Sequence, residues 1–587
     1  MKKTFLQTFR LMRCNWRAIV LFELVYRAVL VALAWPVYKL ALDGAMSIAG
    51  FSYLNHENVD EFMAHPAVIV VTVLVVAVFA AYELLDIAAL HYICAQSLQD
   101  GRAYALDAFS FAGRQLTRPR NLPLLLLTLL LVPLLSIGVV FGIVFSMETP
   151  ELLFEHMQAY MPIVTTAGIA ALVAIVLLFR LMFSFAYAFF NGEGFVSAVR
   201  KSWRAGRHRS IGDLFSVLLA QILMWAACAF VLALVLVPVG FVLPGDIAGR
   251  HVSRETMLAT VTIIPALIGS GLLVNTPTSV ATMLARLSLR SEEIDELTLP
   301  ASLEGSKHRT ILHVAATCLA VACLAWGAHH LWTNTLGPIY EFRHDGHNVY
   351  ITAHRGGGAN APENTLAAFQ NAKKDNAWMC ELDVQMSKDG KIFVSHDSNF
   401  NRISGVDKAA WELTYDEVLA LDATGEKWKQ KFETQHYPLL DEVLDWADKE
   451  GMSMNIELKP TGHETNFEQA VVDIIHAHNF ADRCIVTSQV YETVANVKKC
   501  DPNITTVYVA RFLYGDAHKM EGIDIFSIEE NSARPILVKT LVDNGKGVLA
   551  WTINSKRGVE RAIINGVDSV ITDDVPMAKE VIAEMIQ

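Results

Sequence analysis

Paired cysteines are absent from this chain. Its eight cysteines are scattered along 587 residues, none belongs to a CxxC pair, and five lie in the apolar first part of the sequence. A disulfide-stabilised scaffold needs cysteines at close and regular spacings. The sequence therefore predicts no disulfide framework, and we interpret the cysteines as small buried apolar side chains.

A surplus of positive charge is also missing, since the formal net charge is −12. From Glu341 onward there are 25 Lys and Arg against 39 Asp and Glu, a balance of −14, whereas the earlier part carries 23 against 21. Proteins that bind nucleic acid need a basic surface. The acidic C-terminal part therefore argues against a nucleic-acid partner, but it is compatible with an anionic substrate held through a metal ion.

Charged residues are scarce in the first 340 positions, where long apolar runs replace them. The mean hydropathy of the chain, +0.34, is high for a soluble protein. Each run reaches the roughly 20 residues that a helix needs to cross a bilayer, and no signal-peptide cleavage site follows the basic N-terminus. We predict a helical membrane domain over residues 1–340 with about seven spans. The spans are expected near 18–43, 67–92, 122–145, 162–186, 214–243, 257–285 and 310–333.

Positive charge alternates from one predicted loop to the next. The loops 93–121, 191–213 and 286–309 are basic, whereas 44–66 and 146–161 contain neither Lys nor Arg. Basic loops stay in the cytoplasm. The N-terminus is therefore predicted to be cytoplasmic and, after seven spans, the C-terminal domain extracytoplasmic.

Two features leave an alternative to this count. The loop 244–256 carries Arg250 and Arg254 on the side predicted to be outside. The run 257–290 contains two prolines and two glycines, a composition that allows two short spans or a re-entrant segment. An eighth span would return the C-terminal domain to the cytoplasm.

Five ionisable residues lie inside the predicted spans, where charge is costly and is paired or functional. They are Glu23, Arg27, Glu83, Asp86 and Arg180. Glu23 and Arg27 are four residues apart and can neutralise each other on one helix face. We interpret the set as paired structural charges, with Arg180 reaching towards the cytoplasmic side. A polar cavity that binds a lipid headgroup is the alternative.

Long apolar runs are lacking from residue 346 onward, and short β-branched segments alternate there with helical periodicity. Eight such segments in about 240 residues predict a parallel (β/α)8 barrel over residues 346–587. An extra strand, 391–395, follows the Asp389-Gly390 turn too closely for a crossover helix, and 398–436 is predicted to be an insertion. The eight barrel strands are expected at 349–353, 378–384, 454–458, 484–488, 505–509, 523–528, 547–552 and 569–572.

Carboxylates gather at the ends of two of these strands. Glu381 and Asp383 stand two residues apart, on the same face of one strand, and Glu457 and Lys459 repeat this spacing on the next. The carboxyl ends of barrel strands converge on one mouth. Glu381, Asp383 and Glu457 therefore form a predicted oxygen-ligand site for one divalent cation, Ca²⁺ or Mg²⁺.

Cationic and titratable groups complete this predicted site. Arg355 and Lys459 supply positive charge that suits a phosphate, and His354 and His396 titrate near neutrality as an acid and base pair. Metal, cations and histidines together indicate phosphodiester cleavage. Each feature alone has a plainer interpretation, such as a surface salt bridge, a structural histidine or a flexible glycine turn. Their occurrence at successive strand ends favours the site.

In this order, the motifs resemble the glycerophosphodiester phosphodiesterase family over about residues 349–580. The apolar part resembles, by pattern, the membrane domain that accompanies some bacterial members. The matching motifs are His354-Arg355, Glu363-Asn364-Thr365, Glu381-x-Asp383, His396-Asp397, Glu457-x-Lys459, Trp551-Thr-x-Asn554, and Gly566-Val-Asp568 with Thr572-Asp573.

The resemblance implies hydrolysis of glycerophosphodiesters to an alcohol and glycerol 3-phosphate, through attack by the substrate's own glycerol hydroxyl and opening of a cyclic phosphate by water. It assigns His354 and His396 as the acid and base. Arg355 and Lys459 would bind the phosphate, Asn364 would lie near the ligand, and Trp551 would line the glycerol or headgroup side. The metal would be held by Glu381, Asp383 and Glu457.

Several substrates stay open, including soluble headgroup diesters, lysophospholipids and polyglycerolphosphate polymers such as lipoteichoic acid. The membrane domain favours lipid-linked ones, with membrane lipids as partners, and the oligomeric state stays open. Two further hypotheses are phospholipase D- or C-like cleavage of lipids and a transporter or sensor that binds phosphodiesters without cleaving them. We expect a multi-pass protein of the cell membrane.

Overall fold

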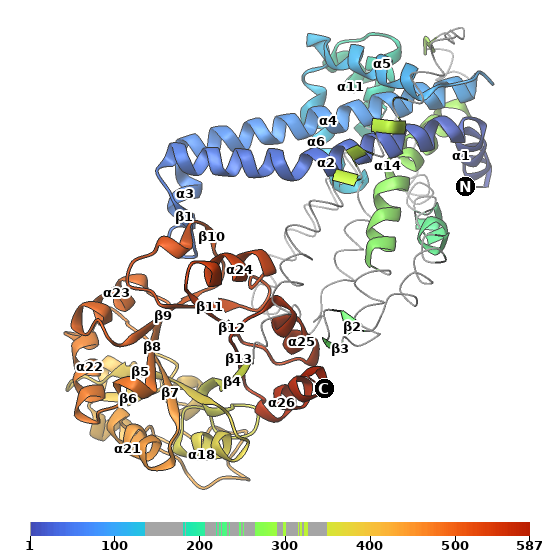
Figure 1. Cartoon of the computed structure of the whole chain (residues 1–587). Coiled ribbons are helices and arrows are strands. Elements are labelled where there is room, and N and C mark those ends of the chain that lie inside the picture. The colour runs from blue at the N-terminus through green and yellow to red at the C-terminus, as the bar shows by residue number, and fades with distance from the viewer. Residues whose placement is uncertain are drawn as a thin grey trace. The chain divides into compact units, whose positions relative to one another are not determined.

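The computed structural model describes residues 2–135, 180–205 apart from Met182, 264–289, 297–300 and 349–586, with short pieces between 219 and 251 and between 315 and 326. The chain divides into two compact units (Figure 1). The helical unit comprises Met1–Leu42, Val70–Pro244 and Ser253–His329. The barrel unit comprises Asp43–Ile69, Gly245–Val252 and His330–Gln587. The boundary predicted between 340 and 346 lies outside the described residues.

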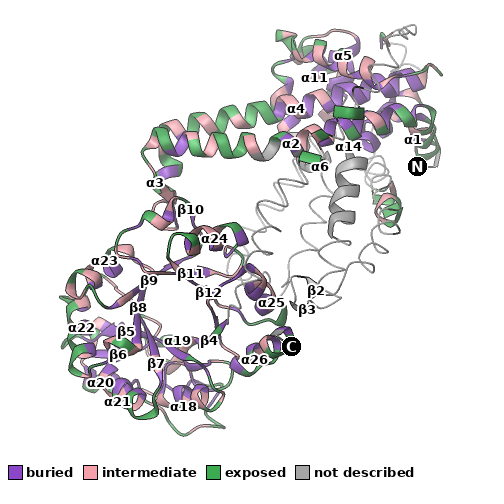
Figure 2. Ribbon diagram, in the orientation of Figure 1, coloured by how far each residue is buried: buried purple, intermediate pink, exposed green. Residues whose placement is uncertain are grey.

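The helical unit contains most of two long helices, α2 (Trp16–Ala49) and α4 (Pro66–Leu98). The C-terminal end of α2 and the N-terminal end of α4, within Asp43–Ile69, belong to the barrel unit. Within the described ranges, α4 is the one helix long and apolar enough to cross a membrane. Its outer face exposes valines and leucines such as Val73 and Val78 (Figure 2), as a lipid-facing surface would. The other helices are α1 (Lys2–Cys14), α5 (Ala105–Leu116), α6 (Leu124–Leu135), α10 (Ser184–Phe190), α11 (Phe195–Ala205) and α14 (Ile264–Ser288).

The predicted seven spans are described only in part. The spans 18–43 and 67–92 fall within α2 and α4, and 257–285 overlaps α14. The spans 122–145, 162–186, 214–243 and 310–333 lie wholly or partly outside the described residues. The count of seven therefore stays a prediction.

The charges inside α2 and α4 pair with one another. The Arg27 guanidinium lies 3.1 Å from Glu23, 3.0 Å from Asp86 and 4.0 Å from Glu83. The guanidinium of Arg180 lies over the ring of Trp203, 4.9 Å from its centroid. These contacts agree with the interpretation of the five residues as structural charges.

Eight parallel strands close into the predicted barrel. Their order around it is β4, β5, β7, β8, β9, β11, β12 and β13, and β13 pairs again with β4. All eight predicted strands are present, with ends shifted by at most two residues. They are β4 (Tyr350–Ala353), β5 (Met379–Met386), β7 (Ser453–Leu458), β8 (Cys484–Ser488), β9 (Thr505–Ala510), β11 (Ile525–Glu529), β12 (Gly547–Trp551) and β13 (Ser569–Thr572).

Both faces of the barrel strands are buried (Figure 2), as expected for a parallel sheet covered by helices. One layer of inward side chains, including Met379, Ile485 and Val507, fills the interior. The outer faces pack against the helices in the main core. Those helices are α18 (Leu366–Lys374), α21 (Leu440–Glu450), α22 (Phe467–Ala477), α23 (Tyr491–Cys500), α24 (Pro535–Asp543), α25 (Lys556–Asn565) and α26 (Val575–Ile586).

Two connections depart from a regular barrel. The extra strand β6 (Ile392–Val394) pairs antiparallel with β5, as the close turn predicted. The insertion after it has a small core of its own, in which Phe400, Tyr415 and Val418 pack against Phe393 of β6. Between β9 and β11 the chain forms no α-helix, but a two-residue strand, β10 (Tyr514–Gly515), and a 3₁₀ turn, Ala517–Lys519.

Candidate active site

A tight turn after β4 presents His354 and Arg355. Arg355 is left-handed, with φ of 51°, and this conformation aims its backbone N–H at Glu381, 2.6 Å from Oε2. Gly356 follows with φ of 82°, and a Cβ there would lie 2.7 Å from Cβ of Ala368 in α18. The glycine turn is therefore required because the backbone passes directly against the helix.

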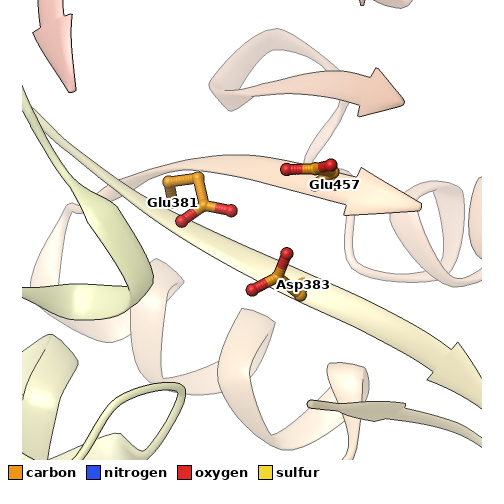
Figure 3. A group of neighbouring side chains, drawn as sticks. All are labelled: Glu381, Asp383 and Glu457. Atoms are coloured by element: carbon orange, nitrogen blue, oxygen red, sulfur yellow. The ribbon is translucent and has the colours of Figure 1, made fainter. Parts of the chain in front are cut away.

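The three predicted metal ligands converge. Glu381 and Asp383 project from β5 and Glu457 from the adjacent β7, towards one another (Figure 3). One oxygen of each lies within 4.8 Å of the others, and all three side chains are buried. Glu381 Oε1 has no hydrogen-bond partner among the described residues. A buried set of carboxylates with a free oxygen fits a hard divalent cation.

The crowding of negative charge shows in the pKa values of these carboxylates. Burial, then the charges of Asp383 and Glu457, raise the pKa of Glu381 well above its ordinary value. Burial also acts to raise the pKa of Asp383, but the positive charge of Lys459 and two further neighbours outweighs it and lowers that pKa to about 2. A divalent cation would relieve the repulsion that acts on Glu381.

Two cations border the carboxylates. Nζ of Lys459 lies 2.7 Å from Glu457 and 3.1 Å from Asp383, and Nε of Arg355 lies 3.7 Å from Asp383. Burial acts to lower the pKa of Lys459, but the charges of Asp383 and Glu457 outweigh it and raise the pKa above its ordinary value. Lys459 therefore keeps its proton and its positive charge beside the cavity.

Each histidine is paired with an aspartate. Nδ1 of His354 lies 2.7 Å from Oδ1 of Asp573, and Nδ1 of His396 lies 2.7 Å from Oδ1 of Asp397. Burial alone would raise the pKa of Asp573, but the hydrogen bond and charge of His354 lower it below its ordinary value. Each carboxylate accepts a hydrogen bond from Nδ1–H of its histidine, and this leaves Nε2 of each ring for chemistry.

A hydrogen-bonded network ties these groups to the insertion. Nε of Arg402 lies 2.5 Å from Asp397, and its NH2 group lies 2.6 Å from Glu363. Glu363 also accepts from Arg355 at 2.9 Å. Arg402 thus links the carboxylate behind His396 to the side chain of Arg355.

A cavity of about 80 Å³ lies at this mouth of the barrel. Seven of the nine predicted site residues line it: His354, Arg355, Glu381, His396, Glu457, Lys459 and Trp551. Asp383 lies just behind the wall, 1% exposed. Asn364, which the resemblance places near the ligand, does not line the cavity; it is buried, and it donates to Oδ2 of Asp383 at 2.8 Å and accepts from the Asp383 backbone N–H. Its place in the structure is that of a residue that orients a carboxylate.

Sequence reasoning missed several polar residues of the site. Asn455, Thr487, Gln489 and Ser527 also line the cavity. The period of two along a strand could have found Asn455, two residues before Glu457, and likewise Thr487 on the next strand and Gln489 just after that strand ends. Arg402 had no such signal, because it comes from an irregular insertion.

Two family models divide the chain between them. Residues 354–577 match the model of the glycerophosphoryl diester phosphodiesterase family, and residues 5–326 match that of the membrane domain of glycerophosphoryl diester phosphodiesterase. The chain belongs to the glycerophosphodiester phosphodiesterase family. This confirms the family resemblance that the motifs indicated. It also confirms the predictions that the protein is an enzyme of the phosphoric diester hydrolase class and that it has a membrane domain.

Similar proteins include two bacterial glycerophosphodiester phosphodiesterases. One from Caldanaerobacter subterraneus is 34% identical over 38% of this chain and 93% of its own length. One from Bacillus altitudinis is 29% identical over 40% of this chain and 98% of its own. Among solved structures, an Oleispira antarctica phosphodiesterase in complex with the product sn-glycerol-3-phosphate is 26% identical, with 40% of this chain and 96% of that chain covered and a TM-score of 0.38.

Proposed function

We propose that the barrel hydrolyses glycerophosphodiesters to an alcohol and glycerol 3-phosphate, with His354 and His396 as the acid and base. One observation carries the proposal: two His–Asp pairs and a carboxylate cluster border the same small cavity. Each imidazole is held at Nδ1 by a carboxylate, which fixes its tautomer and orients Nε2 for proton transfer.

The proton transfers follow from this arrangement. One neutral histidine accepts the proton of the attacking hydroxyl, which the family resemblance assigns to the substrate's own glycerol. The other, as imidazolium, donates its proton to the departing alcohol oxygen as the P–O bond breaks. Water then opens the cyclic phosphate, with the two roles reversed. Arg355 and Lys459 place positive charge beside the phosphate oxygens, where negative charge develops.

Glu381, Asp383 and Glu457 would hold one divalent cation, Ca²⁺ or Mg²⁺. When bound, such an ion supplies further positive charge to the phosphate. Trp551 is proposed to line the glycerol or headgroup side, because its side chain borders the cavity and its indole N–H is anchored to the carbonyl oxygen of Ser527 at 3.1 Å.

We further propose that the barrel works outside the cytoplasm and takes lipid-linked glycerophosphodiesters. Loop charges support the first part: residues 44–66 contain no Lys or Arg, and this connection pairs with the barrel through β1 (Tyr53–Leu54) and β10. The family's membrane domain and the exposed apolar face of α4 support the proposal that the substrates are lipid-linked. Substrate anchored in the bilayer would reach an enzyme anchored in the same bilayer.

The test uses purified full-length protein, with Ca²⁺ or Mg²⁺, on a soluble diester and on a lysophospholipid. We expect the soluble diester to give glycerol 3-phosphate and free alcohol, and the lysophospholipid to give acylated glycerol 3-phosphate and its headgroup alcohol. Activity should be lost on chelation and restored by the metal, and His354→Ala and His396→Ala should each lose about 10²-fold or more. His476→Ala, at an exposed histidine paired with Asp501, is the matched control and should retain activity.

Other products would separate the remaining hypotheses. Release of phosphatidate or diacylglycerol from intact lipids would favour a phospholipase, and unchanged function in both histidine variants would favour a transporter or sensor. Hydrolysis of soluble diesters alone, with every lipid-linked substrate ignored, would overturn the proposed substrate class.

A further inference from the structure

The barrel lacks one of its covering helices, and another part of the chain lies over the strand left bare. In a (β/α)8 barrel a helix normally follows each strand and packs on the outside. After β9 the barrel has β10 and a 3₁₀ turn instead. Residues 51–64, in the connection between α2 and α4, pack there and belong to the same compact unit as the barrel. We call this segment, which contains β1 and the short helix α3 (Val59–Ala64), the clasp.

Backbone pairing fixes the clasp in register. β1 is antiparallel to β10, with Tyr53 opposite Gly515 and Leu54 opposite Tyr514. The backbone N–H of Asp516 also donates to the carbonyl of Ser52 at 2.9 Å. Gly515 has φ of 79°, and a Cβ there would lie 2.6 Å from that same carbonyl oxygen. This glycine is therefore what allows the clasp to approach.

Side chains of the clasp satisfy polar groups of the barrel. Asn55, which is 2% exposed, donates to the hydroxyl of Tyr508 on β9 at 2.8 Å, and that hydroxyl donates to Glu57 at 2.6 Å. Glu57 also accepts from the backbone N–H of Tyr491, the first residue of α23, at 3.2 Å. A carboxylate is favoured there because a helix N-terminus carries partial positive charge. Tyr508 is fully buried beneath these contacts.

One contact of the clasp leads directly into the active site. Nε2 of His56 lies 3.1 Å from the backbone oxygen of Gln489, just after β8, and the His56 ring stacks on Tyr508 with centroids 5.8 Å apart. The side chain of Gln489 lines the cavity and donates to Oε1 of Glu457 at 3.4 Å. Two hydrogen bonds, both made by Gln489, therefore connect His56 of the clasp to the predicted metal ligand Glu457.

We propose that the clasp is a positioning element of the active site: it holds the turn after β8 so that Gln489 orients Glu457. Residues that support a ligand in this way typically change metal affinity by about 10- to 100-fold when they are lost. The effect on metal and substrate rests on the proposed function, whereas the docking of the clasp does not. A barrel expressed without residues 1–340 would lack this support.

Docking is tested by a cross-link in the full-length protein in membranes. Facing residues of an antiparallel pair are about 4.5–5.5 Å apart, within the span of a disulfide. Leu54→Cys with Tyr514→Cys should form a disulfide on mild oxidation, seen as a mobility shift that reductant reverses, and Leu54→Cys alone should not. Absence of that disulfide under conditions that oxidise facing cysteines in a control protein would overturn the docking.

Positioning is tested by loosening the clasp. Gly515→Ala and His56→Ala should weaken Ca²⁺ or Mg²⁺ binding by about tenfold, measured by calorimetry and by the metal concentration that gives half-maximal activity. Gly545→Ala is the matched control, because Gly545 has a similar φ of 72° with nothing within 4 Å of its Cβ position. Circular dichroism melting distinguishes weakened binding from an unfolded variant.

Three outcomes are distinct. Metal binding unchanged in both clasp variants would overturn the positioning role even if the disulfide forms. If Gly545→Ala weakens metal binding to the same extent, the weaker binding in Gly515→Ala reflects backbone strain, and the positioning role is likewise overturned. Failure of the wild-type protein to cleave glycerophosphodiesters would sink the proposed function, while the disulfide and the calorimetry would still report on the clasp.

Discussion

At the scale of single residues, the site is organised by carboxylates that hold other groups in place. Asp573 and Asp397 hold the two histidines, and Glu363 joins Arg355 to Arg402. These pairs are partly buried, so their geometry is restrained more firmly than that of surface salt bridges. The histidines therefore depend on residues that do not touch the substrate.

Arg402 is the residue of this network that most clearly acts from outside the cavity. Replacing it with alanine removes one partner from each of Asp397 and Glu363, so Asp397 holds His396 less firmly. We expect Arg402→Ala to lower kcat by between about tenfold and 10²-fold, with little change in KM. Arg402→Lys should recover only part of the loss, because an ammonium cannot make the same forked contacts.

Steady-state kinetics over a range of pH would measure this effect. Lys429→Ala, which removes another cation of the insertion paired with exposed acidic groups, serves as the control. Equal losses in Lys429→Ala and Arg402→Ala would show that the insertion is merely destabilised, and would contradict the positioning role.

Asp573 links the site to stability in acid. Burial would raise the pKa of Asp573, but the hydrogen bond and charge of His354 lower it in the folded state. A carboxyl whose folded pKa is depressed stabilises the fold above its unfolded pKa, about 3.9, and this stability is lost as pH falls through the folded pKa. We expect Asp573→Asn to flatten the fall in the free energy of unfolding between about pH 5 and pH 2, measured by denaturant titration at each pH. An unchanged slope would mean that the pair contributes nothing to acid stability.

At the scale of elements, the barrel was predictable and its irregular parts were not. Strands such as β5 and β7 are identified by polar residues two positions apart between apolar ones, and that spacing places Glu381 and Asp383 on one face. Local spacing carries no information on contacts distant in sequence. The pairing of β1 with β10 joins segments more than 450 residues apart, so the clasp could not be inferred.

The same limit applies to the residues of the site that lie in loops. The resemblance placed Asn364 near the ligand, and in the structure its side chain, on a left-handed backbone with φ of 58°, contacts the predicted metal ligand Asp383. Arg402 reaches the site only because the insertion folds around Phe400 and brings it there. Position along a strand predicts which face a side chain occupies, whereas loop residues depend on packing that the local pattern does not encode.

At the scale of the whole molecule, the clasp adds a constraint on membrane topology that does not require counting spans. The connection between α2 and α4 carries no positive charge, so the positive-inside rule places it outside the cytoplasm. Because this connection pairs with β10 of the barrel, the two must lie on the same side of the membrane. The barrel is therefore expected outside, which an odd number of spans satisfies and an even number does not.

Labelling with a membrane-impermeant thiol reagent in intact cells would test this prediction, in a variant whose eight native cysteines are replaced. Single cysteines at three exposed positions are informative: Glu61 in the clasp, Ile536 in the barrel and Arg114 in a basic loop. We expect Glu61→Cys and Ile536→Cys to react in intact cells, and Arg114→Cys to react only after permeabilisation. Labelling of the clasp position without the barrel position would contradict both the odd span count and the docking, because one surface cannot pair across a bilayer. If neither Glu61→Cys nor Ile536→Cys is labelled, the clasp and the barrel both lie in the cytoplasm, and the docking of the clasp on the barrel is not contradicted. The two positions together therefore test the orientation of the protein separately from the docking.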